Sequence, residues 1–238
     1  MRLDKYLADC GIGTRSEIKK LIRAGAVRVS GIEKPTPELK IDESSAEVFV
    51  DGERVNYRKF VYLMLNKPAG YVSATWDKNK PVVLDLVPEE YLHFEVFPVG
   101  RLDIDTVGLC VLTNDGGLAH KLLSPARHVP KTYLARVDGP LLEDDVSAFA
   151  EGMDLGDFIA KPARLTILES KGDEALAEVV ISEGKFHQVK RMFEKVGRTV
   201  VYLKRTAMNA LKLDDTLCEG DVRELKPDEL ELLISGTK

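Results

Sequence analysis

Hydrophobic residues recur at helical spacing in the first ten positions of the chain. Leu3, Tyr6, Leu7 and Cys10 follow the i, i+3, i+4, i+7 pattern, which predicts a short helix with one apolar face. The glycines that follow, at positions 11 and 13, are typical of a helix end.

A second short helix is predicted to begin after Thr14. Glu17 stands three residues further on, so the two side chains can form a capping box. Ile18, Leu21 and Ile22 would then face inward, and the basic residues between and around them would lie on the outer side.

The next segment alternates between apolar and polar residues, as strands do. "AVRVSG" and "AEVFVDGERV" show this alternation, and Asp51-Gly52 is a turn signal between two strands. The polar stretch "GERVNYRK" is typical of a linker. We therefore predict a domain boundary near residue 57, with one domain over residues 1–57 and a second over residues 58–238.

The second region contains many predicted strands and few predicted helices. Because no regular βαβ rhythm appears, the pattern favours an α+β fold with a mixed, mostly antiparallel sheet flanked by helices. Strands are predicted in "FVYLMLNKP", "VGLCVLT", "KTYLARV", "ARLTILES", "EALAEVVIS" and "TVVYLKR". Helices are predicted in "LAHKLLS" after an Asp115 cap, in "HQVKRMFEKVG", and in "KPDELELL" with Pro227 near its first position.

Charge is distributed unevenly along the 238 residues. The whole chain carries a net charge of −5, yet residues 1–31 hold seven basic and three acidic side chains. This basic N-terminal segment, or head, in an otherwise acidic chain indicates a module that binds a polyanion. A solvated, charged helix face would show the same composition, so charge alone does not choose between the two interpretations.

The cysteines, the histidines and the length of the apolar runs bear on the class of protein. The three cysteines are far apart and form no CxxC pair, which indicates reduced thiols in a cytoplasmic protein. The four histidines are scattered, so we expect no metal site. No apolar run is long enough to span a membrane, and the start of the chain lacks the apolar centre of a signal peptide.

The segment "GRLDIDTVGL" offers two acidic residues, Asp103 and Asp105, ahead of an apolar strand. Three interpretations are open at this point. An aspartate here can simply form the turn before the strand. A D-x-D pair can hold a divalent cation in a glycosyltransferase, which would then need Mg²⁺ or Mn²⁺. A single carboxylate can act as a nucleophile or as an acid or base, if partners lie elsewhere.

Two other segments contain possible partners. Tyr133 in "KTYLARV" is either a core residue or a flat ring for stacking on a base. Lys190 and Arg191 fall in or near the first turn of a predicted helix, where the helix dipole disfavours cations. That placement points to a carboxylate or phosphate partner, with a pair of flexible surface cations as the alternative.

Taken together, these segments resemble one family. "GRLDIDTVGL", "KTYL" and "EGKFHQVKRMF", in this order, are similar to the signature segments of the type-A bacterial pseudouridine synthases that modify small-subunit (16S) ribosomal RNA. "LNKPAGYVS" resembles the strand and turn that open their catalytic domain. The head, "RLDKYLADCGIGTRSEIKKLIRAGAVRVSG", resembles the alpha-L RNA-binding module of the S-four type.

The resemblance implies a role for each site residue. Asp103 matches the nucleophile, Tyr133 the ring that packs on the target base, and Lys190 the basic partner of the aspartate, where many relatives carry arginine. Arg191 is the alternative partner, Arg101 matches a residue that holds the RNA, and Asp105 receives no catalytic role. The basic residues of the head are implied to contact phosphates: Arg2, Lys5, Arg15, Lys19, Lys20, Arg23 and Arg28.

The implied activity is isomerisation of one uridine of 16S rRNA to pseudouridine, by a monomer that needs no cofactor. The carboxylate either attacks the anomeric carbon or removes a proton to give a glycal, and the sequence does not choose between these routes. The His-Gln pair of "KFHQVK" favours the small-subunit branch, whereas "TAMNAL" departs from the Ile-Gly usual there. The alternatives are a synthase acting on 23S rRNA and a non-catalytic RNA-binding factor of ribosome assembly.

Overall fold

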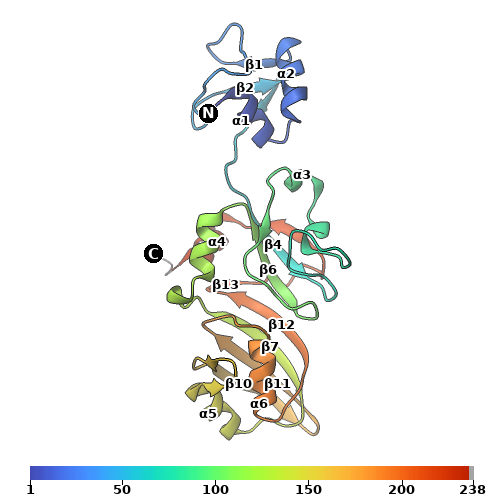
Figure 1. Cartoon of the computed structure of the whole chain (residues 1–238), viewed down its shortest axis with the longest axis vertical. Helices are drawn as coiled ribbons and strands as arrows, with labels where there is room; N and C mark the ends of the chain where they lie inside the picture. Colours follow the sequence, from blue (N-terminus) through green and yellow to red (C-terminus); the bar gives the residue numbers. More distant parts are fainter. Residues whose placement is uncertain (236–238) are drawn as a thin grey trace. The chain divides into compact units, whose positions relative to one another are not determined.

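The chain forms two compact units in a computed structural model that describes residues 1–235. The first unit joins Met1–Val61 with the segment Pro88–Val96. The second unit contains Tyr62–Val87 and the chain from Phe97 onward. Figure 1 labels many of the helices and strands of both units.

The first unit packs two helices against a small antiparallel sheet with the strand order β1-β2-β3. The predicted helices and strands are confirmed. The strand β3 lies within "AEVFVDGERV", where the alternation predicts a strand, and it also overlaps the start of the stretch assigned to the linker. The elements are α1 (Leu3–Asp9), α2 (Arg15–Arg23), β1 (Val27–Val29), β2 (Val48–Val50) and β3 (Glu53–Val55).

The predicted capping box begins α2. The Thr14 hydroxyl accepts a hydrogen bond from the backbone N–H of Glu17 at 3.3 Å, and the Glu17 carboxylate accepts one from the Thr14 N–H at 2.8 Å. These bonds satisfy two N–H groups that the helix itself leaves unpaired. Ile18 and Ile22 are buried on the inner face as expected, and Leu21 is half-buried.

The segment Pro88–Val96 belongs to the first unit although it lies far along the chain. It contains the short helix α3 (Glu89–Leu92). Its His93 ring lies so near Gly11 that a Cβ added there would be 2.8 Å from the ring. Gly11 also has a φ of +75°, so both the close approach and the backbone conformation require glycine.

The second unit is built on one large sheet with the strand order β10-β11-β7-β12-β6-β4-β14. The pair β12–β6 is parallel and the other neighbours in this order are antiparallel, which confirms the predicted mixed, mostly antiparallel sheet. Its strands are β4 (Tyr62–Lys67), β6 (Val107–Thr113), β7 (Lys131–Asp138), β10 (Arg164–Lys171), β11 (Glu174–Ile181), β12 (Val200–Met208) and β14 (Val222–Glu224). Shorter strands are β5 (Phe97–Pro98), β8 (Met153–Asp154), β9 (Ile159–Ala160) and β13 (Leu211–Lys212).

Four helices accompany this sheet, and three of them were predicted. The fourth helix, α5, was not predicted, because its sequence shows almost no apolar face. Phe149 is its single buried residue. Asp115 caps α4 as expected, by accepting a hydrogen bond from the Leu118 N–H at 2.9 Å. The helices are α4 (Gly116–Leu123), α5 (Glu143–Glu151), α6 (Gln188–Lys195) and α7 (Pro227–Ile234), with 3₁₀ turns at η1 (Val83–Leu86) and η2 (Pro125–Arg127).

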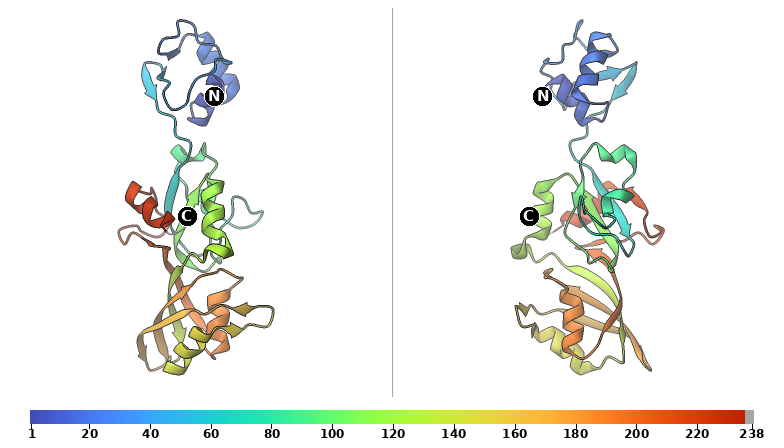
Figure 2. Two further views of the ribbon diagram at one scale, coloured as in Figure 1. Left: turned by 90° about the vertical axis from the view of Figure 1, so that its left-hand side faces the viewer. Right: turned by 45° about the vertical axis from the view of Figure 1, so that its right-hand side comes forward.

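The core of the second unit gathers around β4 and β6. Leu122 of α4 and Leu233 of α7 are fully buried in one cluster with Met64 and Leu109 of these strands. The two views of Figure 2 show the helices α4 and α7 beside this part of the sheet. Both helices therefore hold the sheet by an apolar stripe, as their sequences predict.

Gly108 allows β6 and β12 to pair closely. Its φ is +97°, and a Cβ in this position would collide with the backbone carbonyl oxygen of Arg205. The glycine of "TVGL" is therefore needed for the one parallel pair of the sheet. That pair brings the loop that precedes β6 toward β12 and β7.

Within residues 1–235 no helix is both long and apolar enough to cross a bilayer. In the same range no three histidine, cysteine, aspartate or glutamate side chains are grouped as metal ligands. Cys10, Cys110 and Cys218 are all unpaired thiols.

Candidate active site

A pocket in the second unit is formed by the loop before β6, by β7 and by the start of α6. Asp103, Tyr133 and Lys190, the three residues assigned to catalysis, all line it, and the exposed Arg101 lies at its edge. These residues are up to 89 positions apart in the chain. The full lining is Arg101, Leu102, Asp103, Thr106, Tyr133, Ile181, Gly184, Lys185, His187, Gln188, Val189, Lys190 and Leu203.

Two side-chain nitrogens lie near the Asp103 carboxylate. Lys190 Nζ lies 3.4 Å from Asp103 Oδ2, and His187 Nε2 lies 3.5 Å from Asp103 Oδ1. The Asp103 side chain is 26% exposed, so its carboxylate can be reached from the pocket. The sequence interpretation did not assign any role to His187, although it stands directly before the Gln-Val-Lys of the third segment.

Lys190 contacts Asp105 more closely than it contacts Asp103. Its Nζ donates a hydrogen bond to Asp105 Oδ1 at 2.6 Å. Burial raises the pKa of the Asp105 carboxyl, but the hydrogen bond and charge of Lys190 lower it by more, so this pKa lies below its ordinary value. The sequence interpretation paired Lys190 with Asp103 alone. In the structure the ammonium bridges both carboxylates.

The first turn of α6 is held in place by a buried amide. Gln188 Oε1 accepts a hydrogen bond from the Lys185 N–H at 3.1 Å, and Gln188 Nε2 donates one to Glu183 Oε1 at 2.9 Å. Both side chains are almost fully buried. The helix start is therefore rigid, and it directs Lys190 toward the two aspartates.

Arg191 points away from the pocket. It donates hydrogen bonds to both carboxylate oxygens of Asp157 and, at 2.6 Å, to the Leu155 carbonyl. Its guanidinium also lies 5.0 Å from the centre of the Phe158 ring. These contacts fasten the β8–β9 hairpin to α6. Arg191 was the alternative partner of the aspartate, and the structure engages it elsewhere.

Tyr133 lies on the inner side of β7 and is 8% exposed. It shares that side with Ala135 and Val137, as the alternation in "KTYLARV" predicts. A tyrosine at this place is a core residue over most of its surface. The remaining part of its side chain lines the pocket.

Lys67 holds the loop that carries Asp103, and the sequence interpretation did not single it out. Its Nζ donates hydrogen bonds to the carbonyl oxygens of Asp103, Ile104 and Thr106 at 3.1, 3.3 and 2.8 Å. A further bond at 3.1 Å goes to the adjacent Pro68 carbonyl. The side chain is fully buried, and this burial lowers the pKa of Lys67 to about 8. The signal in the sequence was a lysine at the end of the apolar run "YLMLN".

Two further side chains complete the loop. The Ser73 hydroxyl donates to the Leu102 carbonyl and accepts from the Leu102 N–H, both at 3.1 Å. Thr106 is 1% exposed and lines the pocket, and its hydroxyl has no hydrogen-bond partner within residues 1–235. A buried hydroxyl without a partner lowers the stability of the fold.

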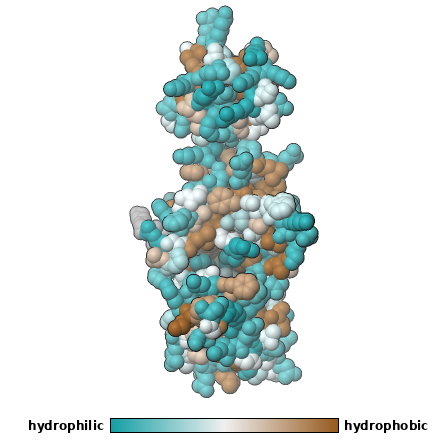
Figure 3. Space-filling view, viewed as in Figure 1, coloured by the Kyte–Doolittle hydropathy of each residue, from teal (hydrophilic) through white to brown (hydrophobic). Residues whose placement is uncertain are grey.

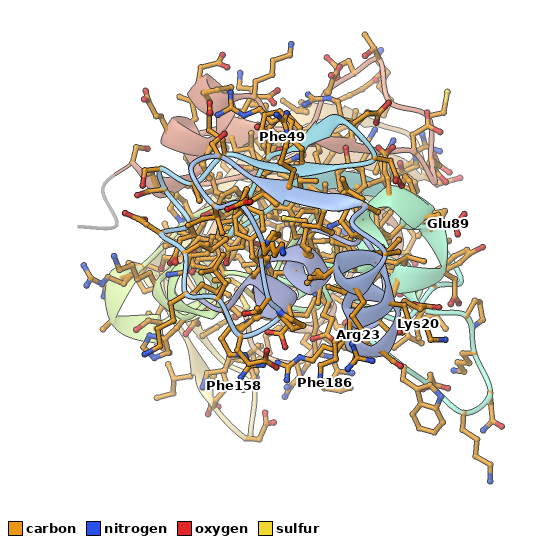
Figure 4. The ribbon with its side chains drawn as sticks, turned by 90° about the horizontal axis from the view of Figure 1, so that it is seen from above. Lys20, Arg23, Phe49, Glu89, Phe158 and Phe186 are labelled. Atoms are coloured by element: carbon orange, nitrogen blue, oxygen red, sulfur yellow. The ribbon has the colours of Figure 1, made fainter. Side chains whose placement is uncertain are left out.

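The basic residues of the first unit fall into two groups. Arg2 and Lys5 are engaged in ion pairs with Asp4 and Asp9, and Arg28 lies over the Phe49 ring at 4.4 Å. By contrast, the exposed side chains of α2 form no ion pair among the described residues, and Lys20 and Arg23 extend outward in Figure 4. The surface of this unit is mostly hydrophilic in the view of Figure 3. The exposed cations are Arg15, Lys20 and Arg23, and Lys19 is half-buried.

A family model described as RNA pseudouridylate synthase matches residues 61–195, and one described as S4 domain matches residues 1–34. The chain belongs to the RNA pseudouridylate synthase family. This synthase is therefore an isomerase that acts on RNA. The S4 match covers both helices of the basic head.

Relatives match this synthase along nearly its whole length. The uncharacterized RNA pseudouridine synthase YtzG of Bacillus subtilis is 47% identical, over 98% of either chain. The ribosomal small subunit pseudouridine synthase A of Yersinia pestis is 38% identical, over 97% of either chain. A solved structure of a pseudouridylate synthase is 36% identical, covers 98% of this chain and 99% of its own, and superposes with a TM-score of 0.68.

Proposed function

We propose that this synthase isomerises one uridine of 16S rRNA and that Asp103 is its catalytic carboxylate. The observation that carries the catalytic assignment is the meeting of Asp103, Tyr133 and Lys190 in one pocket. The 16S assignment rests on similarity to proteins named ribosomal small subunit pseudouridine synthase A, such as those of Yersinia pestis and Pasteurella multocida. Residues 1–57 would capture the RNA and residues 58–238 would perform the chemistry.

The reaction breaks the bond between N1 of uracil and the anomeric carbon, and then joins that carbon to C5 of the same base. The hydrogen of C5 leaves as a proton and N1 gains one, so no redox partner or external group is needed. Asp103 either attacks the anomeric carbon or removes a proton from the sugar. In both routes Lys190 balances the charge of the carboxylate.

The pocket also retains the detached base. The ring of Tyr133 forms a wall on which uracil can pack after it leaves the RNA stack. Leu102, Val189 and Leu203 add apolar surface around it. Such a lining excludes water, which would otherwise hydrolyse the separated sugar to an abasic site.

The test of the 16S assignment is a map of pseudouridines in ribosomal RNA from a strain that lacks this gene. We expect one pseudouridine to disappear from 16S rRNA, because the synthase should modify a single uridine. Purified synthase added to a 16S transcript should restore it, and Asp103→Asn protein is the matched control. Loss of a 23S site with an intact 16S map would contradict the proposed substrate.

The exposed cations of α2 should bind RNA phosphates through counterion release. Replacing Arg15, Lys20 and Arg23 by glutamine should weaken RNA binding and should lower the slope of log K against log salt by about 2 to 3. Turnover at saturating RNA should persist. The measurement is a titration of labelled rRNA at several salt concentrations. Wild-type binding that does not respond to salt would argue against this role of the module.

A further inference from the structure

Phe186 is an unusual residue for the surface of this unit. Its side chain is 74% exposed, and it directly precedes the residues that open α6. An exposed phenylalanine contributes nothing to the core, and neither the candidate catalytic residues nor the cations of α2 explain it.

The Phe186 ring is stacked on the ring of His187. The two ring centres are 3.8 Å apart and the planes differ by 17°. His187 in turn lines the pocket, and its Nε2 lies 3.5 Å from Asp103 Oδ1. His187 has a left-handed backbone conformation with a φ of +50°, which is uncommon outside glycine. Phe186 therefore stands one aromatic ring away from the candidate catalytic carboxylate.

The surroundings of Phe186 suit a nucleic acid strand. His187 covers one face of the Phe186 ring. The rest of the ring is open to solvent. Lys185, the residue before Phe186, and Arg101 have exposed side chains and line the pocket that His187 also lines. Aromatic rings beside cations are the features with which proteins bind unstacked bases and the phosphates between them.

We propose that Phe186, supported by His187, stacks on a base that flanks the target uridine in the RNA. When the uridine enters the pocket, its neighbours lose a stacking partner, which costs a few kcal/mol. The exposed ring of Phe186, stacked on a residue that lines the pocket, replaces that partner. Phe186 thus stabilises the flipped-out arrangement.

This inference rests on the RNA pseudouridine synthase activity and on the pocket of Asp103 being the active site. It does not depend on which ribosomal RNA is modified. The assay therefore uses 16S and 23S rRNA transcripts that carry tritium at C5 of uridine, because the reaction releases that hydrogen.

The informative variants are Phe186→Leu, which keeps apolar bulk but removes the flat ring, and Phe186→Trp, which keeps a flat ring. We expect the leucine variant to raise the KM for RNA about ten-fold and to change kcat by less than about three-fold. The tryptophan variant should match the wild type. Leu168→Ala removes another exposed apolar side chain, on β10, and should have no effect. A leucine variant with wild-type KM, or a tryptophan variant as weak as leucine, would overturn the proposal.

Fluorescence locates the stacked base. 2-Aminopurine placed on either side of the mapped uridine should be quenched on one side by wild-type protein and less by Phe186→Leu. Equal quenching by both proteins would contradict stacking on Phe186. The proposed catalytic site fails separately, if Asp103→Asn still releases tritium, and the 16S assignment fails separately, if the tritium comes from the 23S transcript.

Discussion

Replacing Asp103 by asparagine is expected to abolish pseudouridine formation. The Asp103 side chain is partly exposed in the pocket, so the amide should fit without disturbing the fold. It can neither attack the anomeric carbon nor accept a proton, and we expect the single-turnover rate to fall at least about 10⁴-fold. Tritium release from C5-labelled rRNA measures the rate, and thermal unfolding checks the fold.

Asp105→Asn is the matched control for this prediction. Both aspartates contact Lys190, and Asp105 lies nearer to it, at 2.6 Å against 3.4 Å. If Asp103 alone reacts with the sugar, Asp105→Asn should retain activity within about 10- to 100-fold of wild type, because only the position of Lys190 changes. A folded Asp105→Asn protein without activity, beside an active Asp103→Asn protein, would reverse the assignment of the two acids.

Lys67→Met is expected to reduce the rate about 100-fold or more without altering any residue of the pocket lining. The lysine ammonium binds three carbonyl oxygens of the segment that carries Asp103, and methionine removes all of these bonds. The loop should then lose the position that catalysis requires. Because buried carbonyls lose their donor, the free energy of unfolding at pH 7 should also fall by about 1–3 kcal/mol.

The matched control is Lys131→Met. Lys131 is also buried, its pKa is also lowered to about 8 by burial, and its Nζ donates to the Val129 carbonyl at 2.8 Å. It does not contact the loop that carries Asp103. We therefore expect a comparable change in stability but a rate within about three-fold of wild type. Equal loss of rate in both variants would show that Lys67 acts through stability alone.

The pKa of Lys67 adds a dependence on pH. It lies near 8 in the folded protein and near the ordinary 10.5 when the chain unfolds. Burying the ammonium therefore costs on the order of 3 kcal/mol below pH 8, and this cost disappears as the pH rises from about 8 to 10.5. Wild type should gain stability over Lys67→Met in that range, measured by urea unfolding. The wild-type rate should fall above pH 8, because the neutral amine donates fewer hydrogen bonds to the loop.

Local features of the fold are contained in the sequence. The Thr14–Glu17 capping box, the Asp115 cap and the turn at Asp51-Gly52 were all predicted and are all present. Each depends on residues within three or four positions of one another, so the local pattern determines it. The helix α5 was not predicted, because its local pattern of apolar residues is too weak to indicate an inward face.

The candidate site, too, has features that the sequence indicates and features that only the tertiary structure shows. The resemblance of three separated segments to one family nominated Asp103, Tyr133 and Lys190, whereas the residue types by themselves left turn, core and surface roles open for them. Only the tertiary structure shows the ion pairs of Lys190 with Asp105 and of Arg191 with Asp157. The same holds for the hydrogen bonds from Lys67 to the loop that carries Asp103. These contacts join residues 34 to 85 positions apart. Which cation meets which carboxylate is decided by the packing of strands and helices, because no short-range pattern encodes such a distance.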